Sequence, residues 1–314
     1  NMMPSLIQTL FLLVPVVSST FASVGILLRH VKTPGTIGLL VVDEAGQAQP
    51  QYALGAFYRC RRAMIVGDPK QVEPVVKDDL ELLKQAYNAE GLSLYKAKNI
   101  SVQSFADRMN AIGTYLDNGS DYKEWVGSPL LVHRRCISPM YEISNKLSYG
   151  GIMKQKTMAP KKEIEEKFAL EKSCWINVIG KENGEGSHFV KEQGAKVCEI
   201  LELLFSKNPE PSIYIITPFV SVKDGIREYV RSYCRSHKDT KINCDYITGF
   251  EQNRIGTVHT FQGKEADEVI FLLGCDNTEG ARGAITWVNE NIVNVAVTRA
   301  KYRLYMIGDA DAWD

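Results

Sequence analysis

Acidic and amide side chains follow two apolar runs early in the chain. The first run ends at Asp43 and Glu44, and the second ends near Asp68 and Gln71. Apolar runs that stop abruptly at polar residues are typical of buried parallel strands, whose carboxyl ends deliver polar groups to a bound ligand. Carboxylates and amides are suited to a metal ion and the phosphates that it bridges. The two runs therefore predict the site of a nucleoside triphosphatase.

A glycine-rich phosphate loop normally accompanies such a site. The pattern Gly-x-x-x-x-Gly-Lys-Ser/Thr occurs nowhere in the 314 residues, although it should precede the run that ends at Asp43. We therefore expect the chain to be a fragment of a larger protein, cut after its phosphate loop, with the missing N-terminal part as a partner. Because that loop holds the phosphates, the fragment alone is expected to hydrolyse ATP poorly or not at all.

Composition predicts a globular protein with two cores. Hydrophobic residues make up 45% of the chain and charged residues 24%, and a length of 314 residues suits two domains. The 37 basic and 37 acidic residues cancel, so no overall field favours nucleic acid, although a local groove could still be basic. Seven scattered cysteines without a C-x-x-C pair predict reduced thiols and a cytoplasmic, intracellular location.

The apolar run at Leu10–Val17 is too short to cross a membrane, because a spanning helix needs about 20 residues. We expect no membrane partner and interpret the run as a buried parallel strand that ends in hydroxyl side chains. Similar runs recur along the chain, with amphipathic helical patterns between them. The expected strands are residues 10–17, 37–42, 63–66, 130–132, 175–179, 213–216, 256–258, 269–273 and 304–307, and the expected helices are residues 190–205, 220–233 and 291–301.

Strands that alternate with helices predict an α/β protein with parallel sheets. The turn-rich polar stretch at residues 117–121 predicts a boundary between a partial first domain, residues 1–126, and a complete second domain, residues 127–314. One face of the helix expected at 220–233 is basic, which we interpret as a solvated face, with a nucleic-acid path as the alternative. Its residues are Lys223, Arg227, Arg231 and Arg235.

Several short motifs occur in a characteristic order. They are Asp-Glu-Ala-Gly-Gln at 43–47, Gly-Asp-Pro-Lys-Gln at 67–71, Leu-Val-His-Arg-Arg-Cys at 131–136, Ile-Thr-Pro-Phe at 216–219, Thr-Val-His-Thr-Phe-Gln-Gly-Lys-Glu at 257–265 and Asn-Val-Ala-Val-Thr-Arg-Ala-Lys at 294–301. In this order they resemble the motifs of superfamily 1 helicases, in particular the Upf1/Dna2-like branch of AAA-type P-loop ATPases. The first resembles a Walker B motif. The resemblance covers nearly the whole chain and implies RecA-like sheets flanked by helices.

The resemblance implies that ATP is hydrolysed with Mg²⁺ in a cleft between two domains. Asp43 would bind Mg²⁺ through water, and Glu44 would activate the attacking water. Gln71 would sense the γ-phosphate, while Arg135 and Arg299 would act as arginine fingers from the second domain. The other nucleotide contacts implied are Asp68, Gln262, Gly263 and Glu265.

The resemblance also implies that a single strand of DNA or RNA binds across both domains without sequence preference. His259 could equally be a buried histidine whose hydrogen bonds are satisfied. The residues implied in nucleic-acid contacts are Ser19, Thr20, Thr217, Pro218, His259 and Thr260.

The expected function is therefore the C-terminal portion of an ATP-dependent helicase or translocase core. The alternative is a module that binds nucleic acid or protein through a degenerate NTPase site without turnover. A pure binding module has no need of Glu44, Arg135 and Arg299 together, whereas the missing phosphate loop favours it. A nucleotide kinase is excluded, because the arginine and Thr-Arg-Ala motifs have no place in one.

Overall fold

The computed structural model describes residues 2–74, 100–116, 124–184, 186–249 and 253–314. The chain divides into two compact units, Asn1–Pro129 and Leu130–Asp314, and each is described by itself. The polar stretch at 117–121, where the sequence predicts a boundary, lies outside the described residues. Among the helices of the described ranges, none has both the length and the apolar character needed to cross a membrane.

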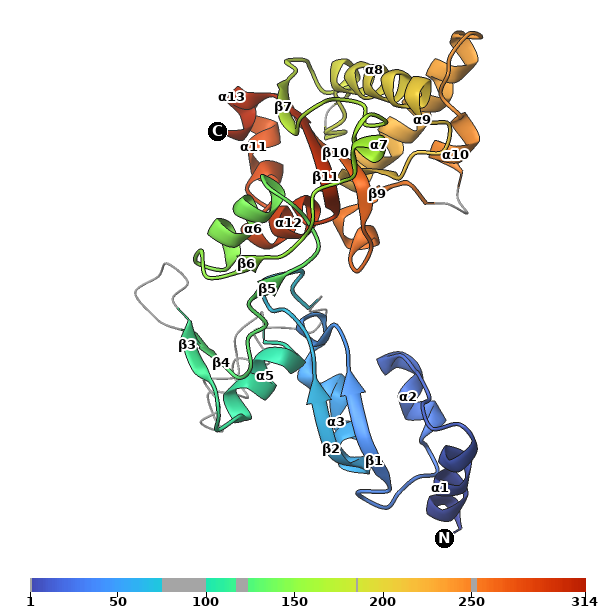
Figure 1. Cartoon of the computed structure of the whole chain (residues 1–314), viewed down its shortest axis with the longest axis vertical. Helices are drawn as coiled ribbons and strands as arrows, with labels where there is room; N and C mark the ends of the chain where they lie inside the picture. The colour runs from blue at the N-terminus through green and yellow to red at the C-terminus, as the bar shows by residue number, and fades with distance from the viewer. Residues whose placement is uncertain (1, 75–99, 117–123, 185, 250–252) are drawn as a thin grey trace. The chain divides into compact units, whose positions relative to one another are not determined.

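The first unit is built on a parallel pair of strands joined by a helix. β1 (Ile37–Val42) and β2 (Cys60–Ile65) pair in parallel, and α3 (Pro50–Arg59) connects them (Figure 1). Pro50 suits the first turn of α3, where its missing N–H costs no helical hydrogen bond. Ala53 is fully buried, and its small side chain allows the helix to pack closely on the strands.

The opposite face of β1 is open. Leu39 and Val41 are 53% and 57% exposed, whereas Val42 is buried with Ala45 and Ala48 in a small core. The prediction of a strand buried on both faces is therefore wrong for β1 within the described residues. A parallel strand is buried on both sides only where helices cover both faces of its sheet, and the described part of this unit covers one.

The apolar run at Leu10–Val17 is not a strand. It begins inside α1 (Met3–Leu13) and continues as coil towards α2 (Phe21–Leu27). Leucine and methionine are good helix formers, and Pro4 lies in the first turn. A helix also closes its backbone hydrogen bonds locally, whereas a strand needs a neighbour. No residue of α1 is buried, so the predicted burial of this run is wrong as well.

Three further elements complete the described part of the first unit. α5 (Val102–Met109) begins with a capping box, in which Ser101 and Ser104 satisfy each other's backbone N–H groups. Val102 is fully buried in the same small core as Val42. β3 (Thr114–Leu116) and β4 (Glu124–Val126) form an antiparallel pair.

The second unit contains a five-stranded parallel sheet. Its strands lie in the order β7-β11-β10-β8-β9, and every neighbouring pair is parallel. Because successive strands are parallel, each connection must cross over the sheet, and helices make most of these crossings. The strands are β7 (Cys174–Asn177), β8 (Ile213–Thr217), β9 (Ile255–Thr257), β10 (Ala266–Gly274) and β11 (Ala300–Gly308).

Both faces of this sheet are buried. Ile270 and Leu272 belong to the core cluster formed with α8 (Lys191–Lys207) and α9 (Val220–Ser236). Val269 and Phe271, which alternate with them and point to the other face, are fully buried too. Figure 1 shows α8 and α9 on one side of the sheet and α6 and α12 on the other. The predicted α/β fold, with a parallel sheet flanked by helices, is confirmed.

Short elements fill the rest of the second unit. β5 and β6 form a parallel pair that precedes the main sheet. The remaining elements, together with one 3₁₀ turn of the first unit, are β5 (Val132–His133), β6 (Lys154–Gln155), α6 (Met140–Ser148), α7 (Lys162–Glu165), α10 (Cys244–Thr248), α11 (Glu279–Ile285), α12 (Glu290–Val297), α13 (Ala310–Trp313), η1 (Ala45–Gln47) and η3 (Val258–Phe261).

Two details of the second unit differ from the sequence predictions. The helix expected at 291–301 ends at Val297, and Arg299 lies in the turn before β11. The basic face of α9 is not simply solvated, because Arg227 donates to the Ile255 carbonyl at 2.8 Å and Arg231 donates to the Thr248 carbonyl at 3.2 Å. The two guanidinium groups therefore link α9 to β9 and to the end of α10.

Candidate functional site: two acidic turns and a buried arginine

The turn after β1 presents the first pair of carboxylates. Asp43 is exposed, and its Oδ1 accepts the backbone N–H of Glu44 at 2.9 Å. Glu44 adopts a left-handed conformation, φ 52° and ψ 37°, which is uncommon for a residue with a side chain. Its Oε2 accepts a hydrogen bond from Gln47 Nε2 at 3.1 Å. This hydrogen bond holds the Glu44 side chain in one orientation. The sequence motif did not reveal the interaction between Glu44 and Gln47.

The turn after β2 packs directly on the first turn through two glycines. A Cβ atom on Gly67 would lie 2.6 Å from the Gly46 nitrogen, and one on Gly46 would lie 2.5 Å from the Asp68 carbonyl oxygen. Contacts under 3.0 Å are not tolerated by real side chains, so both positions require glycine. The Ala45 N–H also donates to the Val66 carbonyl at 3.0 Å. The two acidic turns therefore form one backbone unit.

Asp68 organises its own turn. Its Oδ1 accepts the Lys70 N–H at 2.9 Å, and its Oδ2 accepts Gln71 Nε2 at 3.0 Å. Lys70 Nζ in turn lies 2.7 Å from a Glu124 carboxylate oxygen, a contact between distant parts of the chain that no sequence motif predicted. The described structure brings Asp68 and Gln71 together, as the sequence predicted for residues of one strand end.

A cavity of about 400 Å³ lies beside the first acidic turn. Its lining includes Ser19 and Thr20, which precede α2, and Asp43 and Glu44, which follow β1. These residues come from distant parts of the sequence and were predicted for different ligands. The cavity is polar at this end and apolar where β1 lines it, so it combines anchoring groups with apolar surface, as ligand sites do.

Two predicted nucleic-acid contacts of the second unit lie at the carboxyl end of β8. Thr217 is fully buried, and its Oγ1 accepts the Phe219 N–H at 3.3 Å across Pro218. After β9, His259 and Thr260 lie in η3, and the Thr260 hydroxyl is 3.2 Å from the Thr257 hydroxyl. His259 is exposed, so the alternative of a buried, satisfied histidine is wrong.

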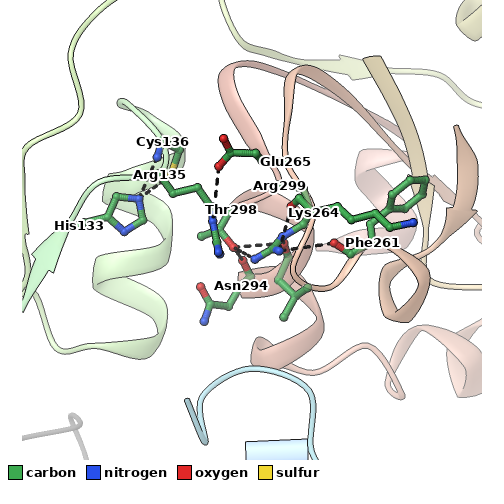
Figure 2. A network of polar contacts seen from close by, with 10 residues as sticks. His133, Arg135, Cys136, Phe261, Lys264, Glu265, Asn294, Thr298 and Arg299 are labelled. Carbon is green, nitrogen blue, oxygen red and sulfur yellow. Dashed lines mark hydrogen bonds and ion pairs between the residues drawn. The ribbon is translucent and has the colours of Figure 1, made fainter. Parts of the chain in front are cut away.

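His133 and Cys136 shape the turn that presents Arg135. The Cys136 N–H donates to His133 Nε2 at 3.0 Å, and the buried Cys136 thiol lies 2.9 Å from the same nitrogen (Figure 2). Burial, with Arg135 adding to it, lowers the pKa of His133, so the ring is a neutral acceptor at pH 7. Burial raises the pKa of Cys136 to about 12, so its thiol stays protonated beside this nitrogen.

Arg135 itself reaches towards the Phe-Gln-Gly segment. Its Nε lies 3.9 Å from a Glu265 carboxylate oxygen, and both side chains are partly exposed (Figure 2). An exposed pair at that distance contributes little to stability, so Arg135 can exchange it for another anion. Nearby in sequence, Gly263 has φ 77°, a backbone conformation that favours glycine.

Arg299 is the most deeply buried charged residue of the candidate site, with no exposed surface. Its Nε donates to the Val295 carbonyl at 3.0 Å and its Nη1 to the Lys264 carbonyl at 3.0 Å (Figure 2). Its Nη2 donates to the Thr298 hydroxyl at 3.2 Å. Arg299 therefore ties the end of α12 to the segment that follows η3.

One buried polar atom has no protein partner in this region. Gln262 Nε2 is buried without a hydrogen-bond partner within the described residues. A buried unpaired amide costs about 1–3 kcal/mol, so a ligand atom that accepted its hydrogen bond would recover that cost. The predicted nucleotide contact at Gln262 is thus compatible with its surroundings.

Two family models, each described as an AAA domain, match residues 4–79 and 119–311. The chain belongs to this family, and within it to the Upf1-like superfamily 1 type that its motifs predicted. Regulator of nonsense transcripts 1 of Dictyostelium discoideum is 25% identical over 86% of this chain and 18% of its own length. ATP-dependent helicase NAM7 of Saccharomyces cerevisiae is 25% identical over 86% of this chain and 25% of its own length.

Among solved structures, an arterivirus nonstructural protein 10, a helicase in complex with DNA, aligns with a TM-score of 0.38 and 15% identity. The alignment covers 86% of this chain and 39% of that one. The chain spans between 11% and 22% of the length of the first three curated relatives.

Proposed function

We propose that this chain is part of the motor core of an ATP-dependent helicase or translocase that moves on single-stranded DNA or RNA. Residues 1–126 would belong to its first RecA-like domain and residues 127–314 would form its second. The observation that carries the proposal is the pair of acidic turns, which two glycines join into one backbone unit. Relatives named as ATP-dependent helicases support the same activity.

Asp43 and Glu44 would perform the chemistry on the first unit. Asp43 Oδ1 is occupied by the Glu44 N–H, which leaves Oδ2 of an exposed carboxylate for a water bound to Mg²⁺. Bound Mg²⁺ would neutralise charge on the phosphates. Glu44, held by Gln47, would accept a proton from the attacking water. Asp68 would orient Gln71, whose amide would respond to the γ-phosphate.

The second unit would supply positive charge and nucleic-acid contacts. Arg135, in its weak pair with Glu265, would leave that carboxylate for the negative charge that develops during hydrolysis. Gln262 and Gly263 would contact the nucleotide. Buried Arg299 would add positive charge and hold its own turn in place. Its hydrogen bonds to backbone carbonyls favour this role over that of an arginine finger that extends to the phosphate.

A nucleic-acid strand would bind through hydroxyl and backbone groups, which suit phosphates and carry no sequence information. Exposed His259 could stack on a base. The seven cysteines, all free thiols in the structure, support an intracellular location. The residues proposed for direct contacts are Ser19, Thr20, His259 and Thr260, whereas Thr217 and Pro218 are buried and would shape the strand end beside them.

A binding module without turnover is the second candidate. It would share the acidic turns and the nucleic-acid contacts but lack hydrolysis, which needs phosphate contacts such as the backbone cradle of a glycine-rich loop. Such a module would still bind nucleic acid, so binding and hydrolysis must be measured separately.

The test is ATP hydrolysis with and without single-stranded DNA or RNA, measured on this chain and on a protein in which a phosphate-loop segment precedes it. We expect stimulated hydrolysis in the second protein and a loss of about 10²-fold or more in its Glu44→Gln variant. Glu279→Gln, which changes an exposed carboxylate on α11, is the matched control and should keep full activity.

Fluorescence anisotropy with a labelled single strand should show that Glu44→Gln binds nucleic acid as well as the parent does. If the Glu44→Gln variant still hydrolyses ATP at the parent rate, Glu44 is not the base that activates the water. Binding without stimulated hydrolysis in both proteins would select the non-hydrolysing module.

A further inference from the structure

Glu182, His188 and Cys275 bring three different metal-binding side chains together in the second unit. One donor atom of each lies within 4.8 Å of the others. Glu182 and His188 both follow β7 in the chain, whereas Cys275 directly follows β10. His188 Nδ1 is 3.0 Å from Glu182 Oε1. None of these residues belongs to the helicase-like motifs, so the cluster needs an explanation of its own.

Backbone contacts fix the cluster. The Cys275 N–H donates to the His188 carbonyl at 2.7 Å, and the Glu182 N–H donates to Asp276 Oδ2 at 3.1 Å. The His188 backbone also packs tightly on β10, because a Cβ on Gly274 would lie 2.5 Å from the His188 carbonyl oxygen. The three donors are therefore preorganised by the fold and do not depend on flexible side chains meeting by chance.

The charge around the cluster is unbalanced. The Glu182 side chain is 10% exposed and Asp276 is 8% exposed. Within the described ranges, neither carboxylate forms an ion pair with lysine or arginine, and His188 is the one partner that can carry positive charge. Buried carboxylates normally require a cationic partner or a metal. Hydrogen bonds from Thr278 to Asp276 and from the His188 N–H to Glu182 satisfy carboxylate oxygens but leave their negative charge in place. A bound cation would supply positive charge beside them.

The donor set indicates which cation. Thiolate, imidazole and carboxylate together suit Zn²⁺ better than the oxygen-seeking Mg²⁺ or Ca²⁺. Zinc binds nitrogen and oxygen at about 2.0–2.2 Å and sulfur at about 2.3 Å. In a tetrahedral site, neighbouring donors are then roughly 3.3–3.8 Å apart, so only small movements separate the present cluster from ligation. His188 is 21% exposed, which gives an ion access from solvent.

We propose that Glu182, His188 and Cys275 bind one divalent ion of the zinc class, with a fourth position open to water or another ligand. The ion would join Glu182 and His188 to the residue that follows β10. The centroids of the His188 and Phe219 rings are 5.0 Å apart, and Phe219 lies just after β8. A bound ion would therefore also restrict the end of that strand. The inference does not depend on helicase activity.

The test is a titration of the metal-free, reduced full chain with Co²⁺, which reports on its ligands by absorption. We expect one ion per chain, a sulfur-to-cobalt charge-transfer band and visible bands typical of tetrahedral coordination, all displaced by Zn²⁺. Cys275→Ser should lose the charge-transfer band. His188→Gln removes a direct ligand and should bind at least about 100-fold more weakly, because loss of an outer-shell partner alone costs about 10- to 100-fold. Cys60→Ser, which removes a half-buried thiol of the first unit, is the matched control and should keep the band.

Circular dichroism would establish that each variant is folded. If Cys275→Ser does not fold, His188→Gln still tests the site. At one Zn²⁺ concentration, the thermal unfolding midpoint of the parent chain should rise by more than that of His188→Gln. A charge-transfer band that persists undiminished in both variants would assign the ion to other thiols. The absence of a band at Co²⁺ well above the protein concentration would overturn the proposal.

Discussion

The acidic turns of the first unit and the Arg299 turn of the second unit present charge in opposite ways. Asp43 is exposed, and its turn is held by backbone packing between Gly46 and Gly67. Arg299 has no exposed surface, and its own guanidinium holds the turn together by binding backbone carbonyls. In the first unit the charged side chains remain available for a ligand, whereas in the second the charged side chain is itself part of the scaffold.

The difference has an energetic consequence. A buried guanidinium that loses its partners, or carbonyls that lose their guanidinium, cost far more than an exposed carboxylate that is neutralised. Substitutions of the acidic residues are therefore expected to change function with little change in stability. Substitution of Arg299 is expected to change both.

The largest effect should follow Arg299→Ala. The change leaves the Val295 and Lys264 carbonyls without their donor, and hydrogen bonds to charged groups contribute about 1.5–3 kcal/mol each, so the free energy of unfolding should fall by about 3 kcal/mol or more. Urea unfolding followed by tryptophan fluorescence measures this. Arg235→Ala, which removes an exposed arginine paired with Glu228, should cost less than about 0.5 kcal/mol. Equal costs for the two variants would refute the structural role of Arg299.

The next effect concerns Glu268, a buried carboxylate of β10 that accepts hydrogen bonds from the Tyr305 hydroxyl and the Ala169 N–H. Burial raises its pKa to about 7 from an ordinary value near 4.5. The folded chain therefore holds an extra proton between these values, and stability should fall as pH rises from 4.5 to 7. This term amounts to at most about 3 kcal/mol.

Glu268→Gln removes the titrating group. The difference in unfolding free energy between pH 5 and pH 8 should therefore be smaller in the variant than in the parent, because other titrating groups contribute equally to both. Urea unfolding at the two pH values measures the difference. An unchanged difference would mean that Glu268 titrates normally in the folded chain and that the core of the second unit does not hold a proton.

The smallest effect should follow Gly67→Ala. The added methyl would meet the Gly46 nitrogen at 2.6 Å, so the two acidic turns must separate, at a cost of about 1–3 kcal/mol. Gly38→Ala is the control, since nothing lies within 4 Å of its Cβ position. Urea unfolding and hydrogen exchange of the amides at 43–47 compare the two. Equal behaviour would show that the turns do not depend on this contact.

Much of the fold could be predicted because the strands of the second unit carry long Val, Ile and Leu runs. Val269 to Leu273 is apolar at every position, which only a strand covered on both faces requires. The same argument failed at Leu10–Val17, where leucine-rich sequence formed α1 instead. A short apolar run is equally compatible with a buried strand and with a helix. The presence of neighbouring strands decides which of the two forms.

The candidate site was predictable only where motif and turn coincide. Asp43 and Glu44 follow β1 directly, and Asp68 and Gln71 lie in the turn after β2, so their place at one sheet edge could be predicted from the sequence. The placement of Arg299 in a turn, and its complete burial, did not follow, because an arginine within an apolar segment looks the same whether it binds phosphate or carbonyl groups. The ion pair between Lys70 and Glu124 could not be predicted from the sequence either.

The sequence by itself determined the α/β class, the order of the helicase-like motifs and the carboxylates at the strand ends, because periodicity and turn chemistry act over a few residues. Tertiary structure alone decided that Gly46 touches Gly67, that Arg299 is enclosed by carbonyls and that Glu182 and His188 meet Cys275. These contacts join residues that are distant in the chain, and only the crossovers of a parallel sheet bring such residues to the same edge.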